Sequence, residues 1–243
     1  MGYDGVEVAV GCASDLRDAG LREALLDTGL SISSVSTGQL SAVRGLSLSH
    51  PDVGERRRAV DAVAKIIEGA AGLSDFVNIG RVRGCAGSST LRDTEERFLE
   101  SAHDLCDRAD ACGVRLLLEP VNRYEIDFIN TLPEGAALVE RIGRRSMALM
   151  PDLFHMNIED ADIETEIERC RNLIGYVHLA DSNRKAPGMG HLDFVAVKRA
   201  LDSAGFRGWT AVEILPFPDP DSAARTAIAR LRACGYPPLS SGT

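Results

Sequence analysis

Four residues in the second half of the chain have types and positions that could hold a metal ion. Each lies within a short apolar run or directly after one, and neighbouring members are between 26 and 35 residues apart. The four are Glu119, Asp152, His178 and Glu213. Any one of these carboxylates alone could simply cap the helix that follows it. Their recurrence in successive units favours a shared site.

Three carboxylates buried together repel one another and need a compensating positive charge. A divalent cation supplies that charge. Three carboxylates and one imidazole form a mostly hard donor set, which favours Mn²⁺, with Mg²⁺ and Co²⁺ as alternatives. We therefore predict one divalent metal ion, held by these four side chains.

The elements that must position these residues are short apolar runs alternating with longer amphipathic stretches. The runs are rich in Val, Ile and Leu and show little polar alternation, which is typical of strands covered on both faces. We expect strands at residues 6–10, 31–35, 76–79, 114–118, 147–150, 174–179 and 210–215.

The stretches between the runs have the features of helices. Apolar residues recur at helical spacing over 98–112, and Gly113 follows as a stop signal. The sequence TLPE at 131–134 predicts a helix start with a capping box and a proline in the first turn. A last helix should begin near residue 221 and bury Ile228 and Leu231.

Strands separated by helices indicate consecutive βαβ units and a parallel sheet. Because no G-x-G-x-x-G turn marks a dinucleotide crevice, a closed α/β barrel is favoured over an open sheet. The carboxyl ends of barrel strands meet at one rim, so the four candidate ligands should lie together there. We expect a single barrel domain over residues 1–236 and a flexible C-terminal tail over 237–243.

Composition excludes some classes of function. The formal net charge is −9, which argues against a nucleic-acid-binding surface. No apolar run is long enough for a membrane span, for which about 18 residues are needed. The six cysteines contain no C-x-x-C pair, which favours reduced thiols and a cytoplasmic protein. Assembly into a homo-oligomer stays open.

Three segments carry a resemblance to a known family. They read EPVNRYE at 119–125, DLFHMNIE at 152–159 and HLADSNR at 178–184, the last followed by PGMG at 187–190. They resemble the xylose-isomerase-like TIM-barrel superfamily of sugar phosphate isomerases and epimerases. Within it they are most similar to the ketose 3-epimerases of the D-tagatose/D-psicose 3-epimerase group. The detailed likeness spans residues 114–216.

This resemblance implies a (β/α)8 TIM barrel. Since only seven strands are expected here, the first βα unit of such a barrel is missing from this chain. Strands 6–10 and 210–215 would then have open edges, which proteins seldom leave uncovered.

The resemblance also implies a function. The protein would be a divalent-metal-dependent epimerase or isomerase of a ketose or related keto-sugar. Glu119 and Glu213 would be both metal ligands and the acid/base pair, and Glu125, His155 and Arg184 would contact the substrate. A proton next to the carbonyl would be removed, and a metal-bound cis-enediolate would be reprotonated.

Other functions fit the same barrel. A metal-dependent dehydratase of the inositol type would share the proton abstraction, and a non-catalytic barrel could bind a sugar or a metal. Isomerisation between aldose and ketose would use the same ligands. The related zinc endonucleases fit poorly, because the chain has only five histidines and a net charge of −9.

Two arginines suggest a separate hypothesis. Arg81 and Arg83 follow the predicted strand 76–79, at the same rim of the barrel. They could recognise a phosphate or carboxylate on the substrate. Alternatively, they form salt bridges with carboxylates at the barrel mouth.

Overall fold

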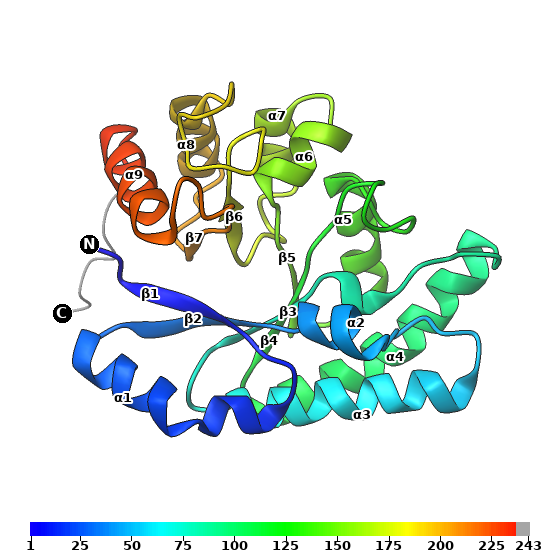
Figure 1. Ribbon diagram of the computed structural model, residues 1–243. Coiled ribbons are helices and arrows are strands. Elements are labelled where there is room, and N and C mark those ends of the chain that lie inside the picture. Colours follow the sequence, from blue (N-terminus) through cyan, green and yellow to red (C-terminus); the bar gives the residue numbers. More distant parts are fainter. Residues whose placement is uncertain (237–243) are drawn as a thin grey trace.

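The computed structural model describes residues 1–236, which form seven strands alternating with helices (Figure 1). The strands are β1 (Gly5–Ala9), β2 (Ser31–Ser36), β3 (Phe76–Ile79), β4 (Arg115–Leu118), β5 (Met147–Leu149), β6 (Val177–Leu179) and β7 (Thr210–Val212). All seven predicted strands are present. The last two are shorter than expected: Ile174 joins Leu149 only by an isolated bridge, and the Leu215 N–H donates to the carbonyl of Arg184 in a loop.

Every strand pair is parallel, and the strands follow chain order. Strands β1 to β5 form one sheet and β6 pairs with β7. Two isolated bridges, Leu149 with Ile174 and Asp152 with His178, connect the two groups. In the described residues no strand lies between β1 and β7, so these two edges face each other across a seam. Within residues 1–236, the barrel wall is therefore open between β1 and β7.

The helices lie on the outside of the strands (Figure 1). They are α1 (Ala19–Thr28), α2 (Gly38–Arg44), α3 (Val53–Ala70), α4 (Leu91–Cys112), α5 (Leu132–Ile142), α6 (Leu153–Glu159), α7 (Ile163–Arg169), α8 (Phe194–Ser203) and α9 (Pro220–Ala233), with short 3₁₀ turns at Ala13–Arg17 and Arg81–Arg83. Helix α4 ends at Gly113 in the left-handed region, as predicted. The capping box of Thr131 and Glu134 at the start of α5 is also confirmed.

The apolar core has two parts. The larger part lies between the strands and the surrounding helices. The smaller part fills the barrel interior and consists of Leu117, Ala148, Met150 and Tyr176, with Phe76, Trp209 and Ala211 packed against them. The hydroxyls of Tyr176 and Ser33 form a hydrogen bond there at 2.8 Å. Because the interior is packed, space for a small molecule lies at the rim and along the seam.

The seam borders a cavity of about 800 Å³. Residues of β1, β7, α8 and α9 line it, and so do His178 and Glu213 of the candidate metal site. Ile228 of α9 is only half-buried and lines this cavity, so the prediction that Ile228 is a core residue is wrong. Leu231 is buried as expected.

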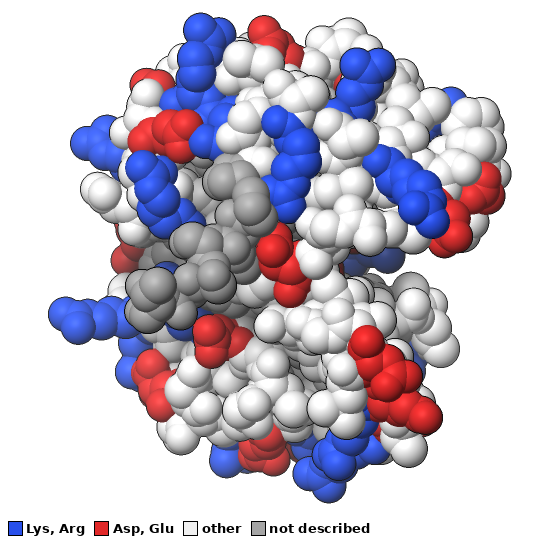
Figure 2. Space-filling view, turned by 90° about the vertical axis from the view of Figure 1, so that its left-hand side faces the viewer, with Lys and Arg blue, Asp and Glu red and all other residues white. Residues whose placement is uncertain are grey.

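The face that contains the seam is shown in Figure 2. Basic side chains stand out in its upper half, on the side of α8 and α9, and α9 itself carries Arg225, Arg230 and Arg232. Within residues 1–236, no helix has the length and apolar character that crossing a membrane requires. The predicted tail, 237–243, lies outside the described residues.

Candidate active site

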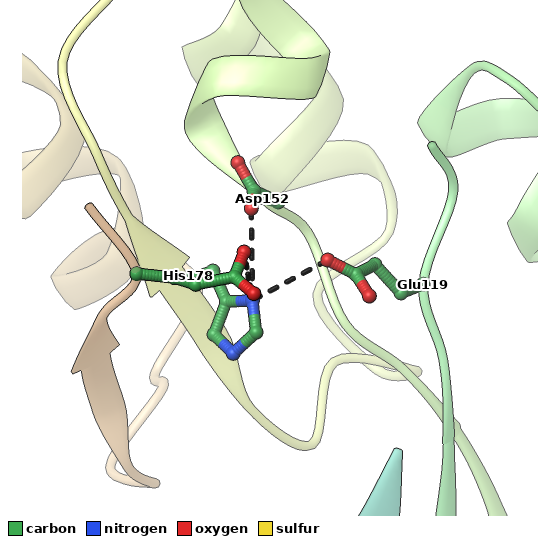
Figure 3. Close-up of side chains that lie close together, drawn as sticks. Glu119, Asp152 and His178 are labelled. Carbon is green, nitrogen blue, oxygen red and sulfur yellow. Dashed lines mark hydrogen bonds and ion pairs between the residues drawn. The ribbon is translucent and has the colours of Figure 1, made fainter. Parts of the chain in front are cut away.

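The four predicted ligands come together at the carboxyl ends of the strands. Glu119 follows β4, Asp152 caps α6, His178 lies in β6 and Glu213 follows β7. One donor atom from each lies within 4.8 Å of the other three. Figure 3 shows Glu119, Asp152 and His178 converging from separate elements.

His178 lies at the centre of this four-residue cluster. Its Nδ1 is 3.3 Å from Glu119 Oε1, 3.6 Å from Asp152 Oδ2 and 3.6 Å from Glu213 Oε2. The same ring nitrogen therefore faces all three carboxylates. If a cation binds among them, Nδ1 is the nitrogen that can ligate it.

The environment of Asp152 fits a cation. Its Oδ1 accepts the backbone N–H groups of Phe154 and His155 at the start of α6. Its Oδ2 is buried and has no hydrogen-bond partner in residues 1–236. A buried carboxylate oxygen without a donor is costly unless a positive charge lies beside it. This oxygen faces the cluster, so the donor set and its geometry suit a divalent ion.

The two glutamates differ in burial and in proton affinity. Although the Glu213 side chain is 42% exposed, partial desolvation raises the pKa of its carboxyl group to about 8, and the charges of Glu119 and Asp152 add to this effect against the opposing charge of His178. Burial also favours the protonated form of Glu119, but the hydrogen bond and charge of His178 outweigh it and hold the pKa of Glu119 below its usual value. The two carboxyl groups therefore lie in unlike electrostatic surroundings.

His155 lies beside the cluster and is only 2% exposed. Its Nδ1 accepts the backbone N–H of Asn122 at 3.3 Å and lies 2.7 Å from the amide nitrogen of the same residue. An accepting Nδ1 leaves the ring proton on Nε2. That Nε2 lies 3.3 Å from Nη1 of Arg184. Two donors side by side can share one acceptor atom of a ligand.

Arg184 reaches the cluster from the loop after β6. Its Nη2 donates to Glu213 Oε2 at 2.6 Å, and its guanidinium lies over the ring of Phe154 at 4.8 Å. The backbone of Arg184 has a φ of 57°, in the left-handed region. The buried carboxylate of Asp181 stabilises this loop by accepting the N–H groups of Ser182, Gly188 and Leu192.

Glu125 lies at the outer edge of the site. Its Oε1 is 3.8 Å from Arg184 Nη1, and its Oε2 is 3.5 Å from Arg81 Nη1. These side chains line a cavity of about 60 Å³, which Glu119 and Glu213 of the cluster also line. The predicted substrate contacts Glu125, His155 and Arg184 thus border one space next to the cluster.

Arg83 does not face the barrel mouth, so the hypothesis that it recognises an anion is wrong. Its side chain is fully buried and donates to the backbone carbonyls of Gly80, Glu119, Phe128 and Ile129. These bonds use four of its five N–H groups, and the side chain is not exposed to a ligand. The guanidinium instead ties the backbone at Glu119 to the loop before α5. Arg81 forms an ion pair with Glu125, which agrees with the salt-bridge alternative.

The sequence analysis did not identify three residues of the site. Asn78 of β3 donates from Nδ2 to Glu119 Oε2 at 3.0 Å, and Glu7 of β1 places Oε2 3.1 Å from His178 Nε2. The available signal was a polar residue inside an otherwise apolar run. At position 80 only glycine fits, because a Cβ atom there would lie 2.6 Å from Glu119 Oε2.

Residues 1–234 match the family described as Xylose isomerase-like TIM barrel. The chain belongs to this family. The TIM-barrel fold expected from the strand order is therefore confirmed, and so is the resemblance on which the functional prediction was based.

Curated relatives in this family are epimerases. The chain is 31% identical over 216 residues to L-ribulose 3-epimerase from Mesorhizobium japonicum, covering 84% of this chain and 69% of that protein. It is 27% identical over 250 residues to 3-dehydro-D-guloside 4-epimerase from Escherichia coli, covering 96% of this chain and 91% of that protein. These relatives confirm the prediction of an isomerase-class enzyme.

Two solved structures have folds similar to that of this chain. The apo form of 3-keto-D-glucoside 4-epimerase from E. coli has a TM-score of 0.84 at 25% identity and covers 96% of this chain and 90% of its own. D-psicose 3-epimerase with D-tagatose, from Clostridium cellulolyticum H10, has a TM-score of 0.83 at 25% identity, covering 98% and 90%.

Proposed function

We propose that this family member is a metal-dependent epimerase that inverts a carbon next to the carbonyl of a ketose or related keto-sugar. The main observation is that two glutamates from the ends of separate strands, Glu119 and Glu213, belong to one cluster whose donor atoms suit a divalent cation. The relatives' names agree with this chemistry, because carbon 3 of a 2-ketose and carbon 4 of a 3-dehydro sugar both adjoin a carbonyl carbon.

The metal ligands in this proposal are Glu119, Asp152, His178 and Glu213. A divalent ion bound there supplies Lewis-acid polarisation of the substrate carbonyl, which makes the neighbouring C–H bond more acidic. Manganese as the resident ion and the cytoplasm as the location stay predictions.

The proton transfers follow from the two glutamates. Glu119 acts as the base: it removes the proton from the carbon next to the carbonyl and leaves an enediolate. Glu213 acts as the acid and delivers a proton to the opposite face of the same carbon. One C–H bond is broken and one is formed, and the configuration inverts. The reverse reaction exchanges the two roles.

In this proposal, Glu125, His155 and Arg184 bind the substrate. His155 Nε2 and Arg184 Nη1 lie 3.3 Å apart, so one substrate oxygen can accept from both. Glu125 can accept a hydrogen bond from a sugar hydroxyl. These contacts should raise the reaction rate mainly by aligning the reacting carbon between the two carboxylates. The alignment matters because the proton must leave one face of that carbon and return to the other.

Deuterium exchange tests the proposed reaction. The protein with Mn²⁺ is incubated in D₂O with D-psicose, L-ribulose or a 3-keto-glucoside, and the products are followed by NMR. We expect deuterium at the carbon next to the carbonyl and appearance of the epimer. Label at carbon 1 would indicate aldose–ketose isomerisation, and an ultraviolet-absorbing product would indicate a dehydratase. No exchange from protein with bound Mn²⁺ would support a binding-only barrel.

Variants of the two glutamates test their roles. Glu119→Gln and Glu213→Gln, each measured at saturating Mn²⁺, should lower the exchange rate about 10²- to 10⁴-fold, the usual contribution of a general acid or base. Glu100→Gln, which removes the partner of Arg56 in a surface ion pair, is the control and should retain the parent rate. Parent-like exchange in either site variant with metal bound would contradict the assignment.

A further inference from the structure

Glu7 contacts the candidate metal site from the side opposite the carboxylates. It lies in β1, its side chain is 15% exposed, and its Oε2 is 3.1 Å from His178 Nε2. Strand β1 is on one side of the seam, and β6, which carries His178, is on the other. The carboxylate of Glu7 thus contacts Nε2 of His178 across the seam.

The two nitrogens of His178 have separate sets of neighbours. Nδ1 faces Glu119, Asp152 and Glu213, whereas Nε2 faces Glu7. Glu7 is not a member of the four-donor cluster found in residues 1–236, so it is a partner of a ligand and not itself a ligand. A neutral imidazole that ligates a metal through one nitrogen carries its proton on the other.

The ring has little freedom to change this arrangement. Its side chain is fully buried, and the ring of Tyr176 lies against it edge to face, with centroids 5.7 Å apart. The backbone N–H of His178 donates to the carbonyl of Pro151. Packing therefore fixes the orientation of the imidazole and leaves the position of its proton to the hydrogen-bonding partner.

We propose that Glu7 is a positioning residue that holds the proton of His178 on Nε2 and so keeps the Nδ1 lone pair directed at the cation. This inference rests on the metal site of the proposed function. Outer carboxylates that accept from a ligating histidine typically contribute about 10- to 100-fold to metal affinity. Glu7 acts through His178: it does not line the cavity of about 60 Å³ next to the cluster, although it lines the larger cavity at the seam.

Two variants separate the hydrogen bond from simple packing. In Glu7→Leu the acceptor is lost, and the Kd for Mn²⁺ from calorimetry should rise about 10- to 100-fold. In Glu7→Gln the amide oxygen still accepts from Nε2–H, so the Kd should recover most of the way to the parent value. Glu23→Leu, at an exposed position of α1, removes the same charge elsewhere and should leave the Kd unchanged.

NMR of ¹⁵N-histidine-labelled, Mg²⁺-loaded protein gives a readout independent of turnover. The parent and Glu7→Gln should show a slowly exchanging His178 Nε2–H, and Glu7→Leu should lose it to fast solvent exchange. Unchanged Mn²⁺ affinity in Glu7→Leu, or weakened affinity with the Nε2–H signal intact, would overturn the role of Glu7. Absence of Mn²⁺ binding by the parent would overturn the metal site as well, whereas parent binding without epimerase activity would leave the role of Glu7 standing.

Discussion

The two walls of the barrel differ in burial. On the closed wall, every residue of β5 and β6 is buried, and α3 buries five side chains against the sheet. On the seam wall, no residue of β1 or β7 is fully buried, and α1 buries none. Strands paired on both edges and covered by a helix exclude water, whereas strands with one open edge do not.

The candidate metal site spans both walls. The side chains of Asp152 and His178 are fully buried and that of Glu119 is 8% exposed, whereas that of Glu213, beside the seam, is 42% exposed. Three ligands are therefore preset by the closed wall, and the fourth lies where the structure is least constrained. Regions with few buried apolar contacts undergo local opening most readily. We therefore expect the position of Glu213, and of Arg184 bonded to it, to vary more than that of the other three ligands.

The largest expected effect concerns a ligand on the closed wall. Asp152→Ala removes both a helix cap and the unpartnered oxygen, so Mn²⁺ affinity should fall at least about 100-fold, because a ligand contributes more than an outer partner. Asp193→Ala is the matched control, since Asp193 caps α8 through two backbone N–H groups in the same way. Both variants should lose helix stability, but only Asp152→Ala should lose Mn²⁺ in calorimetry. Equal Mn²⁺ binding by both would remove Asp152 from the ligand set.

A smaller effect compares identical substitutions on the two walls. Val77 in β3 is fully buried and Val6 in β1 is 37% exposed. Val77→Ala should lower the free energy of unfolding by about 2–3 kcal/mol, because lost burial and a new cavity add. Val6→Ala should cost less than about 1 kcal/mol. Urea unfolding monitored by circular dichroism measures both. Equal losses would show that the seam is covered in solution.

The smallest effect is a difference in pH dependence. Burial raises the pKa of Asp160, which accepts the Leu132 N–H on the closed wall, to about 6. The ionised form is thus disfavoured in the fold, and stability falls as pH rises from about 4 through 6. Asp160→Asn removes this loss, so it should be more stable than the parent by about 1 kcal/mol above pH 6, allowing for solvent screening, and equal to it below pH 4.

Asp219, the cap of α9 beside the seam, should behave with the opposite sign. The backbone N–H of Ser222 holds the pKa of Asp219 below its usual value. Its ionised form therefore stabilises the fold above the unfolded pKa, and that stability is lost as pH falls. Asp219→Asn should be less stable than the parent at neutral pH and match it in acid. Thermal melts between pH 3 and 8 measure both variants, and changes of the same sign would refute the comparison.

Much of the fold could be predicted from local patterns. Short, mostly apolar runs located all seven strands, because strands covered on both faces need apolar side chains in both directions. Gly113 and the pair Thr131 and Glu134 marked helix ends, since caps are satisfied by residues a few positions away. Glu119, Asp152, His178 and Glu213 could be grouped because equivalent ends of parallel strands must meet at one rim.

The remaining features depend on contacts between distant segments. Three examples follow from how the strands close around the barrel axis. Arg83 is buried and donates to four backbone carbonyls, Ile228 borders a cavity, and Glu7 contacts His178. The sequence by itself determined the order of the strands, the ends of the helices and the four donors at the rim. Only the tertiary structure decided which nitrogen of His178 faces those donors and which faces Glu7. Those properties are set by burial and by charges on other strands, which no local pattern encodes.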